Sequence, residues 1–112
     1  MPSEDRHLAS AKAVLDPLGL YPTPVRITGV RVVRWPWLFR LPILRRFTGY
    51  ATWRVIFLRD ACEGCSPLLV HELCHVWQMQ HHPLRVPLSY LRYGYANNPY
   101  EVEARRAAAT SV

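Results

Sequence analysis

The sequence of 112 residues contains no long apolar run, since its longest plainly apolar stretches are residues 55–58 and 68–70. A membrane-spanning helix needs about 20 such residues. The chain also lacks the basic start and apolar segment of a signal peptide, because Glu4 and Asp5 stand near its beginning. Three cysteines are too few, and odd in number, for a full disulfide framework. These absences predict a cytoplasmic protein.

The length and the composition allow one small domain. Half of the residues are hydrophobic and 20% are charged, which is typical of a globular chain. A TIM barrel or a doubly wound nucleotide-binding fold would not fit within this length. Ten prolines interrupt the chain, so its elements must be short. We therefore predict a single domain over residues 1–112, with a net charge of +6.

The first sixty residues predict one helix and two strands. Ser3 is expected to cap a helix that ends near Leu15. Residues 25–35 are rich in β-branched side chains and predict a strand, with a bulge at Gly29 where the alternation changes phase. Residues 50–59 predict a second strand with apolar side chains on both faces.

Three helices are expected in the second half of the chain. After a turn at residues 60–65, they are predicted at 67–82, 87–95 and 99–109, and each begins at a proline. The resulting order is α-β-β-α-α-α. This order predicts an α+β domain in which a small antiparallel or mixed sheet packs on the 67–82 helix, with further helices at the C-terminal end.

The helix expected at 67–82 carries the motif H-E-x-x-H. His71 and His75 are four residues apart, so both imidazoles project from one helix face and can bind one Zn²⁺ ion. Glu72 is rotated by about 100° from His71, so its carboxylate lies beside the metal and can accept a proton from a metal-activated water. The opposite side of this helix is apolar and predicts a core face: Leu69, Leu73, Val76 and Trp77.

A catalytic zinc site needs a third protein ligand and an open fourth position. His81 and His82 follow on the same helix, so their joint ligation of one tetrahedral ion with the first pair would be geometrically awkward. Glu101 and Glu103 lie on the last predicted helix, which can return toward the metal. Glu101 also stands at the capping-box position of that helix, which is a purely structural role. On the residues alone, Glu101 and Glu103 are equal candidates.

The segments HELCHVWQ (71–78) and NPYEVEAR (98–105) together resemble the gluzincin zinc metallopeptidases. In that family, two histidines of HExxH and a glutamate from a later helix bind zinc. The resemblance points in particular to minigluzincins and to small bacterial HExxH domains found with contractile injection systems. It implies a minimal zincin-like domain in which His71, His75 and Glu101 are the zinc ligands and Glu72 is the catalytic base.

The same resemblance implies how a substrate would bind. In gluzincins, the strand before the active-site helix is an edge strand that pairs with extended peptide, and residues 50–59 are the candidate here. Arg105 stands where the family often has an aspartate that supports a ligand histidine, so that role is either unfilled or filled by another residue. Donors to the oxyanion would come from Tyr90, Tyr93, Tyr95 or His82.

The cysteines give a weak signal. Cys62 and Cys65 form a single C-x-x-C pair, without the second pair that a zinc site of this type would need. We expect structural thiols, with Cys74 packed as a small core residue. The alternative is a latent state in which Cys62 or Cys65 occupies the open zinc position.

Arginine and aromatic residues are concentrated in the first half of the chain. Residues 26–59 contain eight arginines and no acidic residue, and the Arg/Trp-rich segment 31–47 combines such arginines with aromatic side chains. This combination suits an anionic membrane surface or a protein partner, and we expect nucleic acid less. The alternative is a loop that packs over the sheet and leaves its arginines solvated.

Three functional hypotheses follow from these patterns. The favoured one is a zinc-dependent metallopeptidase that hydrolyses peptide bonds of a peptide or protein substrate through a metal-activated water, with Glu72 as general base. The second is a zinc-binding interaction or cargo module with little or no activity. The third is a basic protein that binds a membrane surface or nucleic acid and carries the motif by chance.

Overall fold

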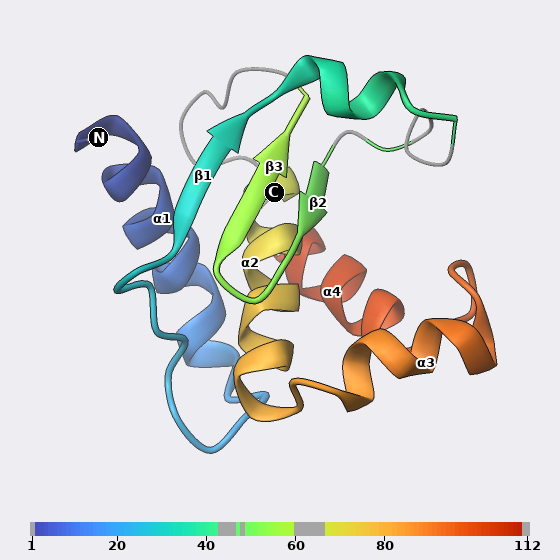
Figure 1. The fold of residues 1–112 in the computed structure, drawn as a ribbon. Helices are drawn as coiled ribbons and strands as arrows, with labels where there is room; N and C mark the ends of the chain where they lie inside the picture. The colour runs from blue at the N-terminus through green and yellow to red at the C-terminus, as the bar shows by residue number, and fades with distance from the viewer. Residues whose placement is uncertain (1, 43–46, 48, 60–66, 111–112) are drawn as a thin grey trace.

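A small sheet lies against a layer of helices (Figure 1). The computed structural model describes residues 2–42, 47, 49–59 and 67–110 of the chain. Within them, the structure confirms the predicted α+β domain with a small mixed sheet. The elements, in chain order, are α1 (Pro2–Leu15), η1 (Asp16–Leu18), β1 (Arg31–Arg34), η2 (Pro36–Arg40), β2 (Gly49–Ala51), β3 (Val55–Leu58), α2 (Pro67–His81), α3 (Arg85–Tyr93) and α4 (Pro99–Ala109).

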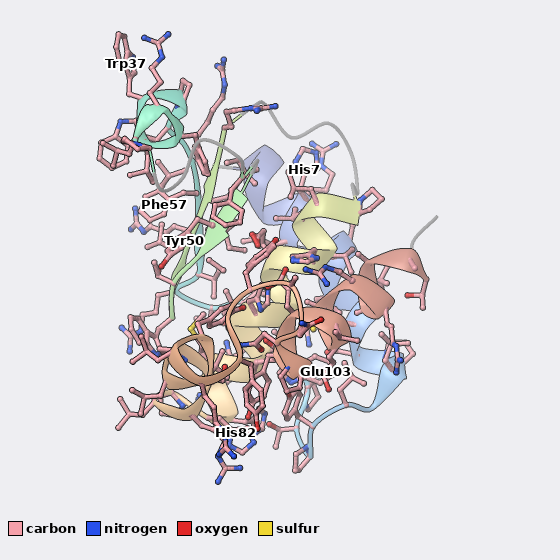
Figure 2. The ribbon with its side chains drawn as sticks, turned by 90° about the vertical axis from the view of Figure 1, so that its right-hand side faces the viewer. His7, Trp37, Tyr50, Phe57, His82 and Glu103 are labelled. Atoms are coloured by element: carbon pink, nitrogen blue, oxygen red, sulfur yellow. The ribbon has the colours of Figure 1, made fainter. Side chains whose placement is uncertain are left out.

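The sheet has the strand order β1-β3-β2. Strand β1 is parallel to β3, and β2 is antiparallel to β3. Ile56 and Leu58 are buried toward the helices, whereas Val55 and Phe57 on the other face are half-buried. Figure 2 shows Phe57 and Tyr50 on the side of the sheet turned away from the helices. The helices therefore cover one face of the sheet.

The strand predicted at 25–35 is shorter than expected and begins only at Arg31. The Val30 N–H donates to the Ile27 carbonyl at 3.0 Å, and Gly29 has a φ of 82°. These are features of a type II turn, whose third residue needs a positive φ and is therefore commonly glycine. The bulge predicted at Gly29 is thus wrong: the phase change in the sequence marks a turn before the strand.

The strand predicted at 50–59 is also wrong as a single element, because it is a hairpin of β2 and β3. The turn between them is closed by Thr52, whose N–H donates to the Val55 carbonyl at 2.8 Å and whose hydroxyl accepts from the Val55 N–H at 3.0 Å. The turn residues Thr-Trp-Arg contain none of the glycine, proline, asparagine or aspartate that usually signals a turn. A threonine side chain supplies the bond that closes it.

Helices α1, α2 and α4 and strand β3 form the core. Leu69, Leu73, Val76 and Trp77 of α2 are all buried, which confirms the core face predicted for this helix. Cys74 is buried among them, as expected, and burial raises the pKa of its thiol. Burial of each large apolar side chain contributes about 1.5–3 kcal/mol, so this face fixes α2 beneath the sheet. No helix in the described part of the chain is both long and apolar enough to cross a lipid bilayer.

Candidate metal centre

Helix α2 places two histidines side by side. The Nε2 atoms of His71 and His75 are 3.2 Å apart, and the two rings meet edge to face. This is the geometry expected for an i, i+4 pair on one helix face. His75 is buried and His71 is half-buried, so both rings are shielded from bulk water on the side that packs against α4.

Helix α4 brings Glu101 to this pair. The Glu101 Oε1 atom lies 2.7 Å from His71 Nε2, and its Oε2 atom lies 2.9 Å from His75 Nε2. The start of α4 is fixed by buried Asn98, whose Oδ1 accepts from the Tyr100 N–H at 2.9 Å and whose Nδ2 donates to Ser89 of α3 at 2.8 Å. The capping interaction therefore uses Asn98, and the Glu101 carboxylate points toward the two histidines.

The other candidate ligands lie elsewhere. Glu103 Oε1 accepts from the Tyr21 hydroxyl at 2.6 Å and from Gln78 Nε2 at 3.0 Å. The rings of His81 and His82 pack against the ring of Tyr21, with centroid distances of 5.1 and 6.0 Å. Among the described residues, the structure thus brings together His71, His75 and Glu101, and it does not bring Glu103, His81 or His82 to them.

The spacing of these three side chains fits a zinc ion. In a tetrahedral site with bonds of about 2.0 Å, neighbouring ligand atoms are about 3.3 Å apart. The two Nε2 atoms are 3.2 Å apart, Glu101 Oε1 lies 2.7 Å from His71 Nε2, and Glu101 Oε2 lies 2.9 Å from His75 Nε2. One ligand atom from each of the three residues therefore lies within 4.8 Å of the other two. Two imidazole nitrogens and one carboxylate oxygen are ligands that zinc accepts, with the fourth position left for water or substrate.

The pKa values of Glu101 and the histidines depend on one another. Burial alone would raise the pKa of Glu101, but hydrogen bonds with His71 and His75 outweigh this effect and lower it. Burial alone would lower the pKa of His75, but Glu101 and Glu72 outweigh this effect and raise it. The carboxylate of Glu101 is therefore held in its charged form, the form that ligates a cation.

Glu72 lies beside the three candidate ligands with an unsatisfied oxygen. Its side chain is only 4% exposed, and its Oε2 atom is buried without a hydrogen-bond partner in the structure. Burial is the main cause of the raised pKa of this carboxyl group. Gly49 of β2 makes room for it, since a Cβ at that position would stand 3.1 Å from Glu72 Oε2. A buried polar atom without a partner is costly unless a ligand or water completes it.

Gln78 is a supporting residue that our sequence analysis missed. Its Nε2 donates to the Tyr100 carbonyl at 2.9 Å and to Glu103 at 3.0 Å, which fixes the orientation of the amide. Its Oε1 therefore faces His75 and accepts from the His75 Nδ1–H at 2.8 Å. This bond selects the tautomer whose Nε2 can bind a metal. The i, i+3 spacing from His75 was a signal that the sequence did contain.

We expect Gln78→Leu to weaken zinc binding by about 10–100-fold, the range typical of lost support to a ligand histidine. Gln80→Leu is the matched control, because Gln80 lies two residues further along α2 and bonds only to the backbone of Arg26. Competition with a chromophoric chelator measures both affinities. Equal affinities for the two variants would show that the bond to His75 has no effect on the metal.

A pocket of about 430 Å³ opens beside Glu72, His75 and Glu101. Two of the predicted oxyanion donors, Tyr90 and Tyr95, line it, whereas Tyr93 and His82 are not among its described lining residues. The Tyr90 hydroxyl donates to Glu101 Oε2 at 2.8 Å. Burial and the nearby Glu101 charge raise the pKa values of both tyrosines. The remaining wall residues are Phe47, Gly49, Tyr50, Ala51, Thr52, Trp53, Met79, Val86 and Pro87.

The strand beside the pocket is β2, not the whole predicted segment 50–59. Strand β3 directly precedes α2 in the order of elements, but it is the central strand of the sheet and is paired on both sides. The expectation that it is an edge strand is therefore wrong. Within the described residues, β2 is an edge strand, and all three of its residues line the pocket.

Some predictions concern residues outside the described part of the chain. Cys62 and Cys65, the turn at 60–65 and residues 43–46 of the Arg/Trp-rich segment lie there.

No family model, curated protein or solved structure gives a significant match to this chain. The interpretation of the site therefore depends on its own geometry.

Proposed function

We propose that this chain is a zinc-dependent metallopeptidase that hydrolyses peptide bonds in a peptide or protein substrate. The observation that carries this proposal is the buried, unpartnered Glu72 carboxylate oxygen beside the converging His71, His75 and Glu101. A site that only stored zinc would have no use for an additional buried carboxylate at the wall of an open pocket. Such a carboxylate is costly to bury, so its presence favours a chemical role.

His71, His75 and Glu101 would hold the ion. When bound, Zn²⁺ supplies Lewis acidity, which makes a water molecule more acidic and polarises the scissile carbonyl. Glu72 accepts a proton from the attacking water as the new C–O bond forms, and it then delivers this proton to the amine nitrogen as the C–N bond breaks. Burial raises the pKa of this carboxyl group, which makes it a stronger proton acceptor than an exposed glutamate.

The wall of the pocket favours substrates with apolar side chains. It is formed largely by aromatic and aliphatic side chains, among them Trp53, Met79, Val86 and Tyr90. The Trp53 Nε1–H donates to the Pro83 carbonyl at 2.9 Å, which links the β2–β3 turn to the segment before α3 and holds the two sides of the pocket together. We expect substrates with a bulky apolar side chain near the scissile bond, bound in extended form along β2.

Hydrolysis of casein by the zinc-loaded protein tests this proposal. Treatment with a strong chelator is expected to reduce the rate to background, and one equivalent of Zn²⁺ is expected to restore it, whereas Mg²⁺ is not, because it prefers oxygen ligands. Cleavage is measured by release of acid-soluble fluorescent peptides. Cleavage that persists in the chelated protein would contradict the proposal.

The second candidate is a zinc-binding interaction or cargo module of low activity. One observation favours it: the group that supports His75 is the neutral amide of Gln78, where a carboxylate would raise the basicity of the ligand. A zinc-loaded protein that binds zinc tightly but leaves casein and denatured protein substrates intact would establish this alternative. That result would support the prediction of zinc binding and contradict the prediction of hydrolysis.

A further inference from the structure

One end of the uncovered sheet face carries a group of exposed aromatic and apolar side chains. Trp37 of η2 is 66% exposed, Leu41 52%, Trp35 47% and Tyr50 of β2 45%. Figure 2 shows Trp37, Phe57 and Tyr50 along the same side of the molecule, away from the helices. Exposed Arg31 pairs with Val55 and therefore lies on the same sheet face, and exposed Arg40 follows Trp37 in η2. These residues define the aromatic–arginine face: Arg31, Trp35, Trp37, Arg40, Leu41 and Tyr50.

The charge on this face is of one sign. Residues 17–59 contain no acidic side chain, and every arginine that the structure describes in that range is exposed. The acidic side chains described elsewhere are buried or have partners: Glu72 and Glu101 are buried, Glu103 accepts from Tyr21 and Gln78, and Asp16 pairs with Lys12. The aromatic–arginine face is therefore complementary to a surface of negative charge.

The mixture of side chains favours a lipid surface over a nucleic acid. Tryptophan and tyrosine are suited to the headgroup level of a bilayer, because their rings combine an apolar body with a polar atom. The Arg40 guanidinium lies 4.0 Å from the centre of the Trp37 ring, so one face of this ring is already covered and is not free for a base to stack on. Leu41 adds an aliphatic side chain, which suits acyl chains and not bases.

We propose that the aromatic–arginine face docks this protein on the surface of an anionic phospholipid bilayer. Trp35, Trp37 and Leu41 enter the interfacial layer, and Arg31 and Arg40 lie at the level of the lipid phosphates. The pocket shares Tyr50 with this face, so docking holds the candidate active site close to the membrane surface. The proposal does not depend on zinc binding or on hydrolysis.

Cosedimentation with vesicles tests it. The full-length protein is expected to bind vesicles of phosphatidylcholine with about one-third phosphatidylglycerol at low salt, about 50 mM, and to be released at about 500 mM. Vesicles of phosphatidylcholine alone are expected to bind at least about tenfold more weakly. The double variant Arg31→Glu/Arg40→Glu and the variant Trp37→Ala are each expected to lower the partition coefficient by at least about tenfold.

Matched controls lie on other parts of the surface. Arg106→Glu on α4 changes an exposed arginine, and Leu91→Ala on α3 changes a more exposed apolar residue, so both are expected to bind within about twofold of wild type. Far-UV circular dichroism verifies that all variants are folded. The proposal is overturned if wild type does not bind the anionic vesicles at low salt, or if the controls lose binding as strongly as the face variants. Preferential binding to a single-stranded oligonucleotide, lost in the same face variants, would assign the face to nucleic acid.

Discussion

Glu101→Gln is expected to weaken zinc binding by more than about 100-fold, beyond the range typical for residues that only support a ligand. The wild-type carboxylate lies within 3 Å of both imidazoles and is held in its charged form by them. A glutamine side chain has nearly the same shape but carries no charge, and its amide oxygen is a poor zinc ligand compared with a carboxylate. The measurement is competition with a chromophoric chelator, together with the zinc content of the purified protein.

Glu103→Gln is the control for this experiment, because the same substitution is made on the same helix two residues away. Its oxygen already accepts two hydrogen bonds from Tyr21 and Gln78, and an amide oxygen can still accept them. We expect zinc affinity within about threefold of wild type. If Glu103→Gln lost the metal and Glu101→Gln kept it, the assignment of the third ligand would be reversed. If neither variant differed from wild type, the three-residue site would be wrong.

Glu72→Gln is expected to reduce casein hydrolysis by about 10²–10⁴-fold, the usual contribution of a general base. The amide cannot take the proton from the attacking water, although it occupies the same space next to Gly49. Zinc affinity is expected to stay within about threefold of wild type, since Glu72 is not among the three converging ligand atoms. The rate and the zinc content are measured on the same preparation, which separates loss of chemistry from loss of metal.

The melting temperature of Glu72→Gln is not expected to fall. The wild-type carboxylate is desolvated and its Oε2 atom has no partner, so replacing it with a neutral group removes a burial cost. A variant that lost activity through unfolding would instead show a lower melting temperature and reduced zinc content. Hydrolysis at the wild-type rate by folded, zinc-loaded Glu72→Gln would refute the role of Glu72 as base. Absence of hydrolysis in both proteins would favour the zinc-binding module.

Much of this site could be predicted from local sequence. The i, i+4 spacing of His71 and His75 determines that they share a helix face, and the apolar residues opposite determine which face is buried. Pro67 located the start of α2, and Asn98 with Pro99 located the start of α4. The prediction for α3 was wrong by two residues at each end, because this helix runs from Arg85 to Tyr93 and Pro87 lies inside its first turn. Gln78 lies three residues from His75, so local spacing contained its role as well, although we did not predict it.

Other features could not be read from the sequence. The hairpin of β2 and β3 was missed because Thr52 closes its turn with a side-chain hydrogen bond, in a segment whose composition is that of a strand. The edge position of β2 depends on which strand pairs with β1, and this pairing joins residues more than twenty positions apart. Such contacts depend on the packing of the whole sheet on the helices and not on local propensity.

The sequence by itself determined that this chain has a helix with a histidine pair, a neighbouring carboxylate and an apolar face on the opposite side. The choice between Glu101 and Glu103 was decided only by tertiary structure. Two residues apart on a helix, they point about 200° away from each other, so the rotation of α4 about its own axis decides which one meets the histidines. That rotation is set by the Asn98–Ser89 hydrogen bond and by the burial of Ala104 and Ala107. These contacts join segments that are distant in the sequence, so local sequence cannot determine which carboxylate points toward the histidines.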